Sequence, residues 1–171
     1  MRSGNCISFA FLMGATMSFA AAVMAAELPR EGSYSGAFSC FGTYRATPVG
    51  AERLLVAFDE NCLSLSNGIL DHVTWHCWGT TDYTNGTGQG QGYCVGNDPD
   101  GDRLAANFGP DEPHTPHQKT WKSPSTLMAG TGKFAGIRGS GTYMNHANEF
   151  RPMADGTFVN YVTFEGSYKL P

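Results

Sequence analysis

Apolar and polar residues alternate along most of this 171-residue chain, which is typical of β-strands with one face in a core. The clearest segment is 157–169, where alternate residues from Phe158 to Tyr168 share one face. Val159 and Tyr161 fall on the opposite face, so both faces carry apolar groups. We therefore expect a barrel strand whose outer face is covered by a loop or a partner.

Seven further segments have β-branched, aromatic or alternating character and are too short for typical helices. They are residues 33–43, 53–59, 61–66, 70–79, 91–96, 103–108 and 141–148. Helix signals are nearly absent, and the 22 glycines favour strongly bent strands. The pattern predicts an all-β fold, a single antiparallel, calycin-like β-barrel of about eight strands.

Two segments interrupt this pattern. Residues 81–92 predict a flexible polar loop or a long hairpin tip. Residues 109–119 hold three prolines and are not expected to form a central strand. Both segments are either binding loops or plain connections. The turn signals at 98–102 and 154–156 separate neighbouring strands.

The N-terminus has the layout of a secretory signal peptide. Arg2 provides a positive charge, residues 7–23 are apolar or small, and Val23-Met24-Ala25 offers a cleavage site. A membrane anchor is the alternative, but the stretch is barely long enough to span a bilayer. We expect residues 1–25 to be removed and 26–171 to form one exported domain, secreted or periplasmic, without membrane insertion.

Charge argues against nucleic acid as a partner. Arg2 is one of 11 basic residues, so the mature chain has 10 basic against 15 acidic residues. No Lys/Arg run remains that could form a basic patch. The oligomeric state does not follow from these features.

Four cysteines remain after Cys6 leaves with the signal peptide: Cys40, Cys62, Cys77 and Cys94. An even number in an oxidising compartment predicts two disulfides, with three possible pairings. We prefer pairing of sequence neighbours, because adjacent strands of a meander lie close together. A zinc site is the alternative, but no C-x-x-C ligand pair is present.

Three groups of residues suggest metal sites without meeting the requirements of one. His72 and His76 lie about 13 Å apart on a strand, so they do not share an ion, and they face either the lumen or, preferably, the outer surface. His114 and His117 lie near Asp111 and Glu112, in what we interpret as a solvated loop. The acidic turn at 98–102 lacks a calcium-loop Glu at position twelve and is explained as a hairpin turn. We predict no metal and no cofactor.

Aromatic side chains are the remaining candidates for a site. They either fill the barrel or line a cavity in it, since an eight-stranded barrel permits both. Our candidate ligand-binding residues are Trp75, Trp78, His72, His76, Tyr143 and Tyr161. No Ser-His-Asp, Cys-His or G-x-S-x-G arrangement can be assembled, so the catalytic residues are unknown. We expect a non-catalytic protein that binds a small hydrophobic molecule.

The segment 130–141 contains five glycines and predicts a turn at one end of the barrel. Gly132, Gly136 and Gly139 would give the backbone its freedom, and Phe134 would anchor it. The stretch Gly130–Gly139 resembles the G-x-G-x-F-x-G-A-x-G segment of the allene oxide cyclase and dirigent-like β-barrels. Ile137 departs from the commoner Ala, and the four cysteines and the acidic turn have no counterpart in that pattern.

This resemblance implies cyclisation or stereocontrol of a reactive hydrophobic molecule inside the barrel, and no catalytic residue can be carried over. An enzyme of the cyclase or isomerase type is therefore an alternative function. It would require a polar group of perturbed pKa in the cavity, for instance His72, His76 or Glu165. A cell-envelope protein that contacts a partner through its two long loops is a further alternative.

Overall fold

The computed structural model describes residues 28–146, 151–152 and 155–171, so the predicted signal peptide lies outside the described residues. The chain folds almost entirely into strands, with a single turn of 3-10 helix, η1, at Gly132–Phe134. The strands are β1 (Glu31–Pro48), β2 (Arg53–Asn67), β3 (Thr74–Thr84), β4 (Thr87–Asn97), β5 (Arg103–Phe108), β6 (Thr120–Gly130), β7 (Arg138–His146), β8 (Arg151–Pro152) and β9 (Thr157–Lys169).

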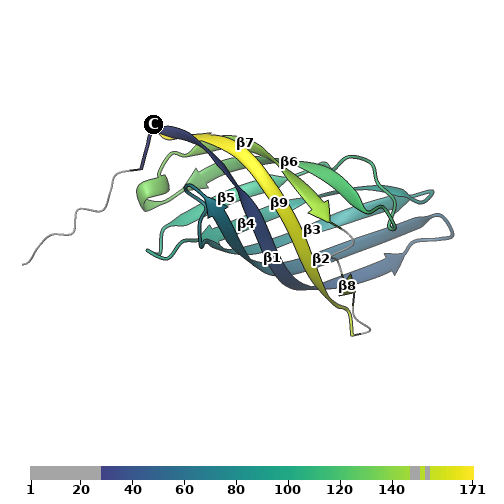
Figure 1. The fold of residues 1–171 in the computed structure, drawn as a ribbon. Helices are drawn as coiled ribbons and strands as arrows, with labels where there is room; N and C mark the ends of the chain where they lie inside the picture. Colours follow the sequence, from purple (N-terminus) through teal and green to yellow (C-terminus); the bar gives the residue numbers. More distant parts are fainter. Residues whose placement is uncertain (1–27, 147–150, 153–154) are drawn as a thin grey trace, which may run out of the picture.

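Eight of these strands close into an antiparallel barrel. Each pairs with its neighbour from β1 to β7, β7 pairs with β9, and β9 pairs back with β1 (Figure 1). The two residues of β8 extend the sheet beside the first part of β9. The predicted all-β fold and the closed eight-stranded barrel are confirmed. Among the described residues, no helix is long and apolar enough to cross a membrane.

Two strands differ from the prediction, β2 and β6. Segments 53–59 and 61–66 form the single strand β2, because Glu60 continues the alternation with its side chain inward. Of the two forms expected for segment 81–92, the structure has the long hairpin tip: β3 and β4 run through it and turn at Asn85 and Gly86, whose positive φ suits a tight hairpin. Strand β6 was not predicted. Segment 109–119 is irregular apart from a bridge between Gly88 and His114.

The glycine-rich segment closes one end of the barrel. Phe134 in η1 and Ile137 are completely buried there, below the start of β7. Gly132 has φ +51°, and a Cβ at this position would overlap the carboxylate of Asp102. Gly136 also has a positive φ, and Gly139 faces the barrel interior from β7. A side chain at Gly132 would therefore disturb both the backbone and the neighbouring turn.

Lys133 connects this segment to the acidic turn between β4 and β5. Its ammonium group forms ion pairs with Asp98 and, at 2.5 Å, with Asp100. Its backbone N–H donates to Asp102 at 3.1 Å. The acidic turn thus has a structural role, in which its carboxylates hold the closing segment in place.

Both disulfides lie inside the barrel and join sequence neighbours. Cys40 on β1 bonds to Cys62 on β2, and Cys77 on β3 bonds to Cys94 on β4. Each pair occupies directly opposite positions of adjacent strands, and all four residues are buried. The preferred pairing of the three is the one observed.

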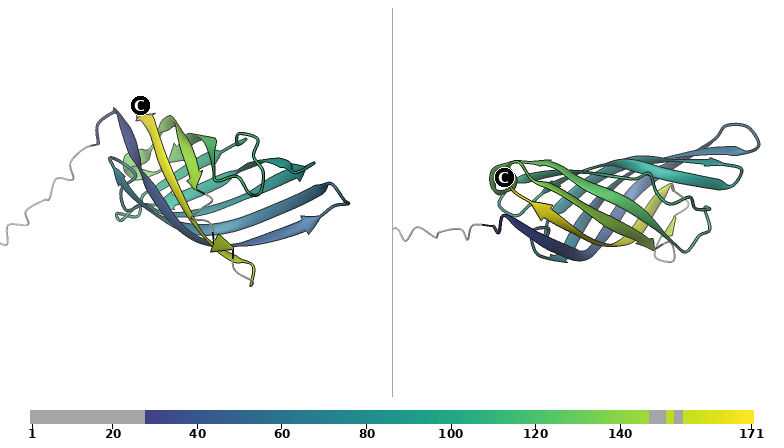
Figure 2. Two further views of the ribbon diagram at one scale, coloured as in Figure 1. Left: turned by 45° about the vertical axis from the view of Figure 1, so that its right-hand side comes forward. Right: turned by 90° about the horizontal axis from the view of Figure 1, so that it is seen from above.

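The interior is unevenly filled along the barrel axis. Large apolar side chains pack near η1, among them Leu70, Val73, Leu104 and Leu127, which are at most 2% exposed. The hairpins β1–β2 and β3–β4 project at the end opposite the C-terminus (Figure 2). The packed core therefore stabilises one end, and the site lies at the other.

Candidate ligand cavity

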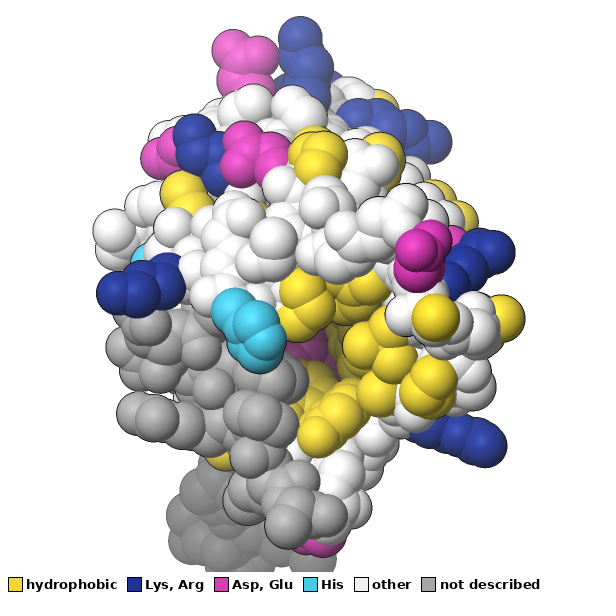
Figure 3. Space-filling model, turned by 90° about the vertical axis from the view of Figure 1, so that its right-hand side faces the viewer, with side chains coloured by type: hydrophobic (Ala, Val, Ile, Leu, Met, Phe, Trp, Pro, Cys, Tyr) yellow, Lys and Arg dark blue, Asp and Glu magenta, His cyan; other side chains and the backbone are white. Residues whose placement is uncertain are grey.

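A cavity of about 320 Å³ opens at the end of the barrel opposite η1. Figure 3 looks onto this end and shows a hollow bordered by hydrophobic side chains, with an acidic side chain in its depth. The large apolar side chains of the lining come from five of the eight barrel strands: Phe38, Tyr44, Leu54, Val56, Phe58, Phe108, Trp121, Phe158 and Val162. The size and lining are those of a site for a small, largely apolar molecule.

Glu60 is the acidic residue at the centre of the barrel wall, on β2. It is 8% exposed, and one of its carboxylate oxygens, Oε2, has no hydrogen-bond partner. Its neighbours are the Cys40–Cys62 disulfide and the side chain of Asn160, which hydrogen-bonds to the carboxylate. Burial raises the pKa of Glu60 to about 7, although the Asn160 bond lowers it. The cavity thus holds one carboxyl group with an unused oxygen.

Space for Glu60 is provided by the facing strand. Gly42 on β1 lies directly opposite Glu60, and a Cβ there would be 2.6 Å from the Glu60 Cβ. Because Gly42 has no side chain, the carboxyl group can turn into the cavity between the two disulfides. A larger residue at Gly42 would displace it.

A second polar group lies at the cavity mouth around Asp111, which is also buried. Ser123 Oγ donates to Asp111 Oδ1 at 2.5 Å, and the Gly90 N–H donates to Oδ2 at 3.2 Å. Asn145 Nδ2 donates to Ser123 Oγ at 3.0 Å. Burial raises the pKa of Asp111, and the Ser123 bond opposes this shift. Unlike Glu60, this carboxylate is fully engaged in fixing a loop to the barrel.

His114 completes this anchoring of the segment 109–119. Its Nδ1 donates to the Glu112 carbonyl at 3.0 Å, and its Nε2 lies 3.1 Å from the Tyr83 hydroxyl. The imidazole stacks on Trp121 with ring centroids 4.4 Å apart. Burial and the charge of Asp111 raise the pKa of Tyr83 to about 12, so its hydroxyl stays protonated and donates to His114. Both ring nitrogens are used, and the loop forms part of the cavity wall.

Two of the six predicted ligand-binding residues point into the barrel. Tyr143 lines the cavity, and burial raises its pKa. Trp75 lies in the packed core, where its indole N–H donates to Ser64 Oγ at 3.3 Å. Both rings contact Phe38 edge to face. Of the two, only Tyr143 borders the cavity.

The other four predicted residues lie outside the barrel: His72, His76, Trp78 and Tyr161. His72 follows β2 in a turn, whereas His76 and Trp78 lie on the outer face of β3. Tyr161 lies on the outer face of β9, as does Glu165. The preferred outer placement of the two histidines is therefore the one observed.

Sequence reasoning missed Glu60 and Asn160, and it placed Asp111 and His114 in a solvated loop, whereas both are buried. Glu60 lies between the predicted segments 53–59 and 61–66, although it shares a face with Phe58 and Cys62. In the described part of the chain, Cys40, Glu60 and Cys62 form the one group of three with metal-ligand spacing. Their two sulfurs are bonded to each other, so they do not offer the thiolates that a metal binds.

Comparison with known proteins gives little beyond this geometry. No protein-family model matches the sequence, and no curated protein matches it. A solved pterocarpan synthase dirigent protein is a structural neighbour, with 12% identity and a TM-score of 0.45 over 82% of this chain and 87% of that chain. The barrel architecture is taken from the chain's own strand pairing, and membership of the dirigent-like family stays a prediction.

Proposed function

We propose that this protein binds a small, mostly apolar molecule with one hydrogen-bond donor inside its barrel. The observation that carries the proposal is Glu60, which lines the apolar cavity and whose buried Oε2 has no hydrogen-bond partner. A buried polar atom without a partner costs free energy, which a donor on a ligand would recover. The aromatic and aliphatic walls would provide the remaining affinity by burying apolar surface.

Glu60 would also set the orientation of the ligand. Asn160 holds the carboxyl group from one side, so the unused oxygen has a fixed direction. An alcohol or phenol would place its hydroxyl there and its apolar body toward the cavity mouth. Charged groups are excluded from the ligand body by the apolar lining.

Matched ligand pairs test this proposal. Calorimetric titration at pH 8 would compare small aromatic alcohols with their methyl ethers, which have the same body but no donor. We expect the wild-type protein to bind the alcohols about tenfold more tightly, equivalent to one hydrogen bond to a charged group. Glu60→Leu should abolish this preference, whereas Glu165→Gln on the outer surface should keep it. Equal affinity for both members of each pair in the wild type would contradict the proposal.

A second candidate function is acid–base catalysis of an isomerisation or cyclisation. The observation that favours it is the pKa of Glu60, which burial raises to about 7, close to the pH at which a general acid or base works best. The histidines considered for this role, His72 and His76, lie outside the barrel. Recovery of every bound ligand unchanged after long incubation would exclude this second function and leave binding intact.

We also propose that the mature protein is exported. Two disulfides are typical of an oxidising compartment, and the predicted signal peptide would direct the chain there. Mass spectrometry of the protein from its native host would test this. An N-terminus at Ala26 and intact disulfides are expected, and an intact N-terminus in the cytoplasmic fraction would contradict export.

A further inference from the structure

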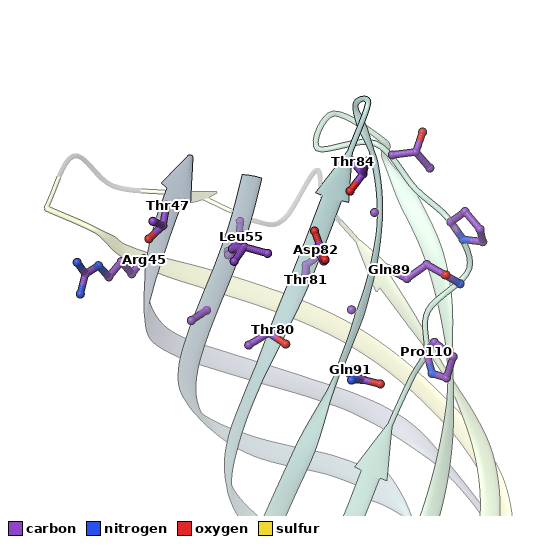
Figure 4. Close-up of a pocket in the computed structure, with 16 residues that line it drawn as sticks. Arg45, Thr47, Leu55, Thr80, Thr81, Asp82, Thr84, Gln89, Gln91 and Pro110 are labelled. Carbon is purple, nitrogen blue, oxygen red and sulfur yellow. The ribbon is translucent and has the colours of Figure 1, made fainter. Parts of the chain in front are cut away.

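A second concave surface lies on the outside of the barrel and shares the wall residues Val56, Thr81 and Gly90 with the ligand cavity. It is a groove of about 820 Å³ across the outer faces of β1–β4, bordered by the segment 109–119. Figure 4 shows Arg45 at one border and Pro110 at the other, with Thr80 and Gln91 between them. Cross-strand pairing places Thr80 directly opposite Gln91.

The groove is nearly uncharged, and its lining combines polar side chains with apolar ones such as Leu55 and Pro110. Its hydroxyl and amide side chains, such as Thr80, Gln89 and Gln91, can both donate and accept hydrogen bonds. Asp82 is the one carboxylate in the lining, and it is neutralised by Arg53, which bonds both of its oxygens at 3.0 and 2.5 Å. A lining of this kind suits a neutral ligand with many hydroxyl groups.

An aromatic platform continues the groove along the same strands. It consists of His76, Trp78 and Tyr93, with Trp78 and Tyr93 directly opposite each other on β3 and β4. Trp78 is 39% exposed and Tyr93 52% exposed, and their ring centroids are 6.4 Å apart. The His76 ring lies 5.2 Å from Trp78 and is fixed by a hydrogen bond to Asp59 at 2.9 Å.

The platform and the groove are contiguous. Trp78 and Thr80 are alternate residues on the outer face of β3, and Tyr93 and Gln91 are alternate residues on that of β4. Alternate residues of a strand lie about 7 Å apart on one face. An extended ligand could therefore rest one part on the rings and bond its next part in the groove.

From this arrangement we infer that the outer face of β3 and β4 binds a neutral glycan chain. Sugar rings have apolar C–H faces, which pack on aromatic rings, and hydroxyl groups at their edges, which Thr and Gln side chains bond. Trp and Tyr provide large, rigid contact surfaces at a low cost in side-chain entropy. The site is separate from the barrel cavity and does not depend on the function proposed for it.

Other occupants fit this surface less well. Nucleic acids and anionic lipid headgroups require a cluster of cations, and Arg45 is the one cation in the lining of the groove. A second copy of the chain would need an interface of about 1,200–2,000 Å² with an apolar centre. Leu55 is the one large exposed apolar side chain in the lining of the groove, where it lies among Thr and Gln residues, and the exposed rings are confined to one end of the groove.

Binding of neutral oligosaccharides to the mature, disulfide-bonded protein tests the inference. The probes are cellohexaose, chitohexaose and maltohexaose, titrated by calorimetry at concentrations up to 10 mM. We expect at least one of them to bind. Trp78→Ala and Gln91→Ala should each weaken that probe about tenfold, the loss of one good contact.

Tyr161→Ala is the matched control, because Tyr161 has the same 39% exposure as Trp78 but lies on β9. It should leave oligosaccharide affinity unchanged, as should Glu60→Gln in the barrel cavity. Far-UV circular dichroism and thermal unfolding would establish that each variant is folded. Failure of all three probes to bind, or equal weakening by Trp78→Ala and Tyr161→Ala, would overturn the inference. So would a dimer in sedimentation experiments that Trp78→Ala dissociates, because a second copy would then occupy the platform.

Discussion

Replacing Glu60 with glutamine should change how stability depends on pH. Burial raises the pKa of Glu60 from its ordinary value of 4.5 to about 7. Between these pH values the folded protein holds a proton that the unfolded chain releases. The free energy of unfolding must therefore fall as the pH rises from 4.5 to 7, and it stays lower above that range.

The size of the effect follows from the two pKa values. At 1.36 kcal/mol for each pH unit, the difference between 4.5 and about 7 corresponds to about 3 kcal/mol. Glutamine has nearly the same shape and does not ionise. The free energy of unfolding of Glu60→Gln, minus that of the wild type, should thus rise by about 3 kcal/mol between pH 4 and pH 8.

Urea unfolding of both proteins at half-unit pH steps, with the disulfides intact, measures this difference. Contributions from other ionisable groups cancel between the two proteins, apart from those coupled to Glu60. Asn160→Ala provides a second test, because loss of its hydrogen bond should raise the pKa of Glu60 further and extend the pH range of the fall. Glu165→Gln on the outer face of β9 is the control and should follow the wild-type profile. A difference between Glu60→Gln and the wild type that does not vary with pH would refute the reasoning.

Three further changes test the fold. Removing one disulfide by Cys77→Ala with Cys94→Ala should lower the free energy of unfolding by about 3 kcal/mol, because it frees a 17-residue loop in the unfolded chain. A loss below about 1 kcal/mol in urea unfolding would contradict this prediction. Phe134→Ala should lower the free energy of unfolding by about 3–5 kcal/mol, because the ring is fully buried at the closed end of the barrel. Calorimetric unfolding measures this loss, and a smaller value would mean that the barrel end collapses around the gap. Gly132→Ala should lower the free energy of unfolding more than Gly50→Ala does. Both positions have a positive φ, but nothing lies within 4 Å of a Cβ at Gly50. Equal losses of about 1–2 kcal/mol in the two variants would contradict the proposed contact at Gly132.

The barrel could be predicted because its main signal is local. Alternation of apolar and polar residues assigns an inner and an outer face within each strand, without knowledge of the partner strand. Strand β6 was not predicted, because its inward positions include Ser123 and Ser125. Serine at these positions resembles the sequence of a polar surface segment. Ser123 points inward and donates a hydrogen bond to Asp111, a residue that only the folded loop brings near.

The cavity could not be predicted in the same way. Whether a barrel is filled or hollow depends on which inward side chains of its eight strands lie at the same height along the barrel axis. The pairing register of the strands sets these heights. Glu60 lies opposite Gly42 on one side and Cys77 on the other, and these are contacts between residues far apart in sequence. The alternation alone therefore predicts two segments, 53–59 and 61–66, and leaves Glu60 outside both of them.

Strand β4 shows how the same residues can suggest a loop in sequence and build a site in the fold. Its inward positions are glycines from Gly88 to Gly96, with Cys94 as the one exception, so the spacing of two was present where the sequence left a flexible loop and a hairpin tip open. Glycine in a strand permits other groups to approach the backbone closely. At Gly90 a Cβ would lie 2.6 Å from the Asp111 carboxylate, which instead accepts the Gly90 N–H. Gly90 is therefore required for the loop to pack against the barrel, and the wall of the cavity mouth depends on its lack of a side chain.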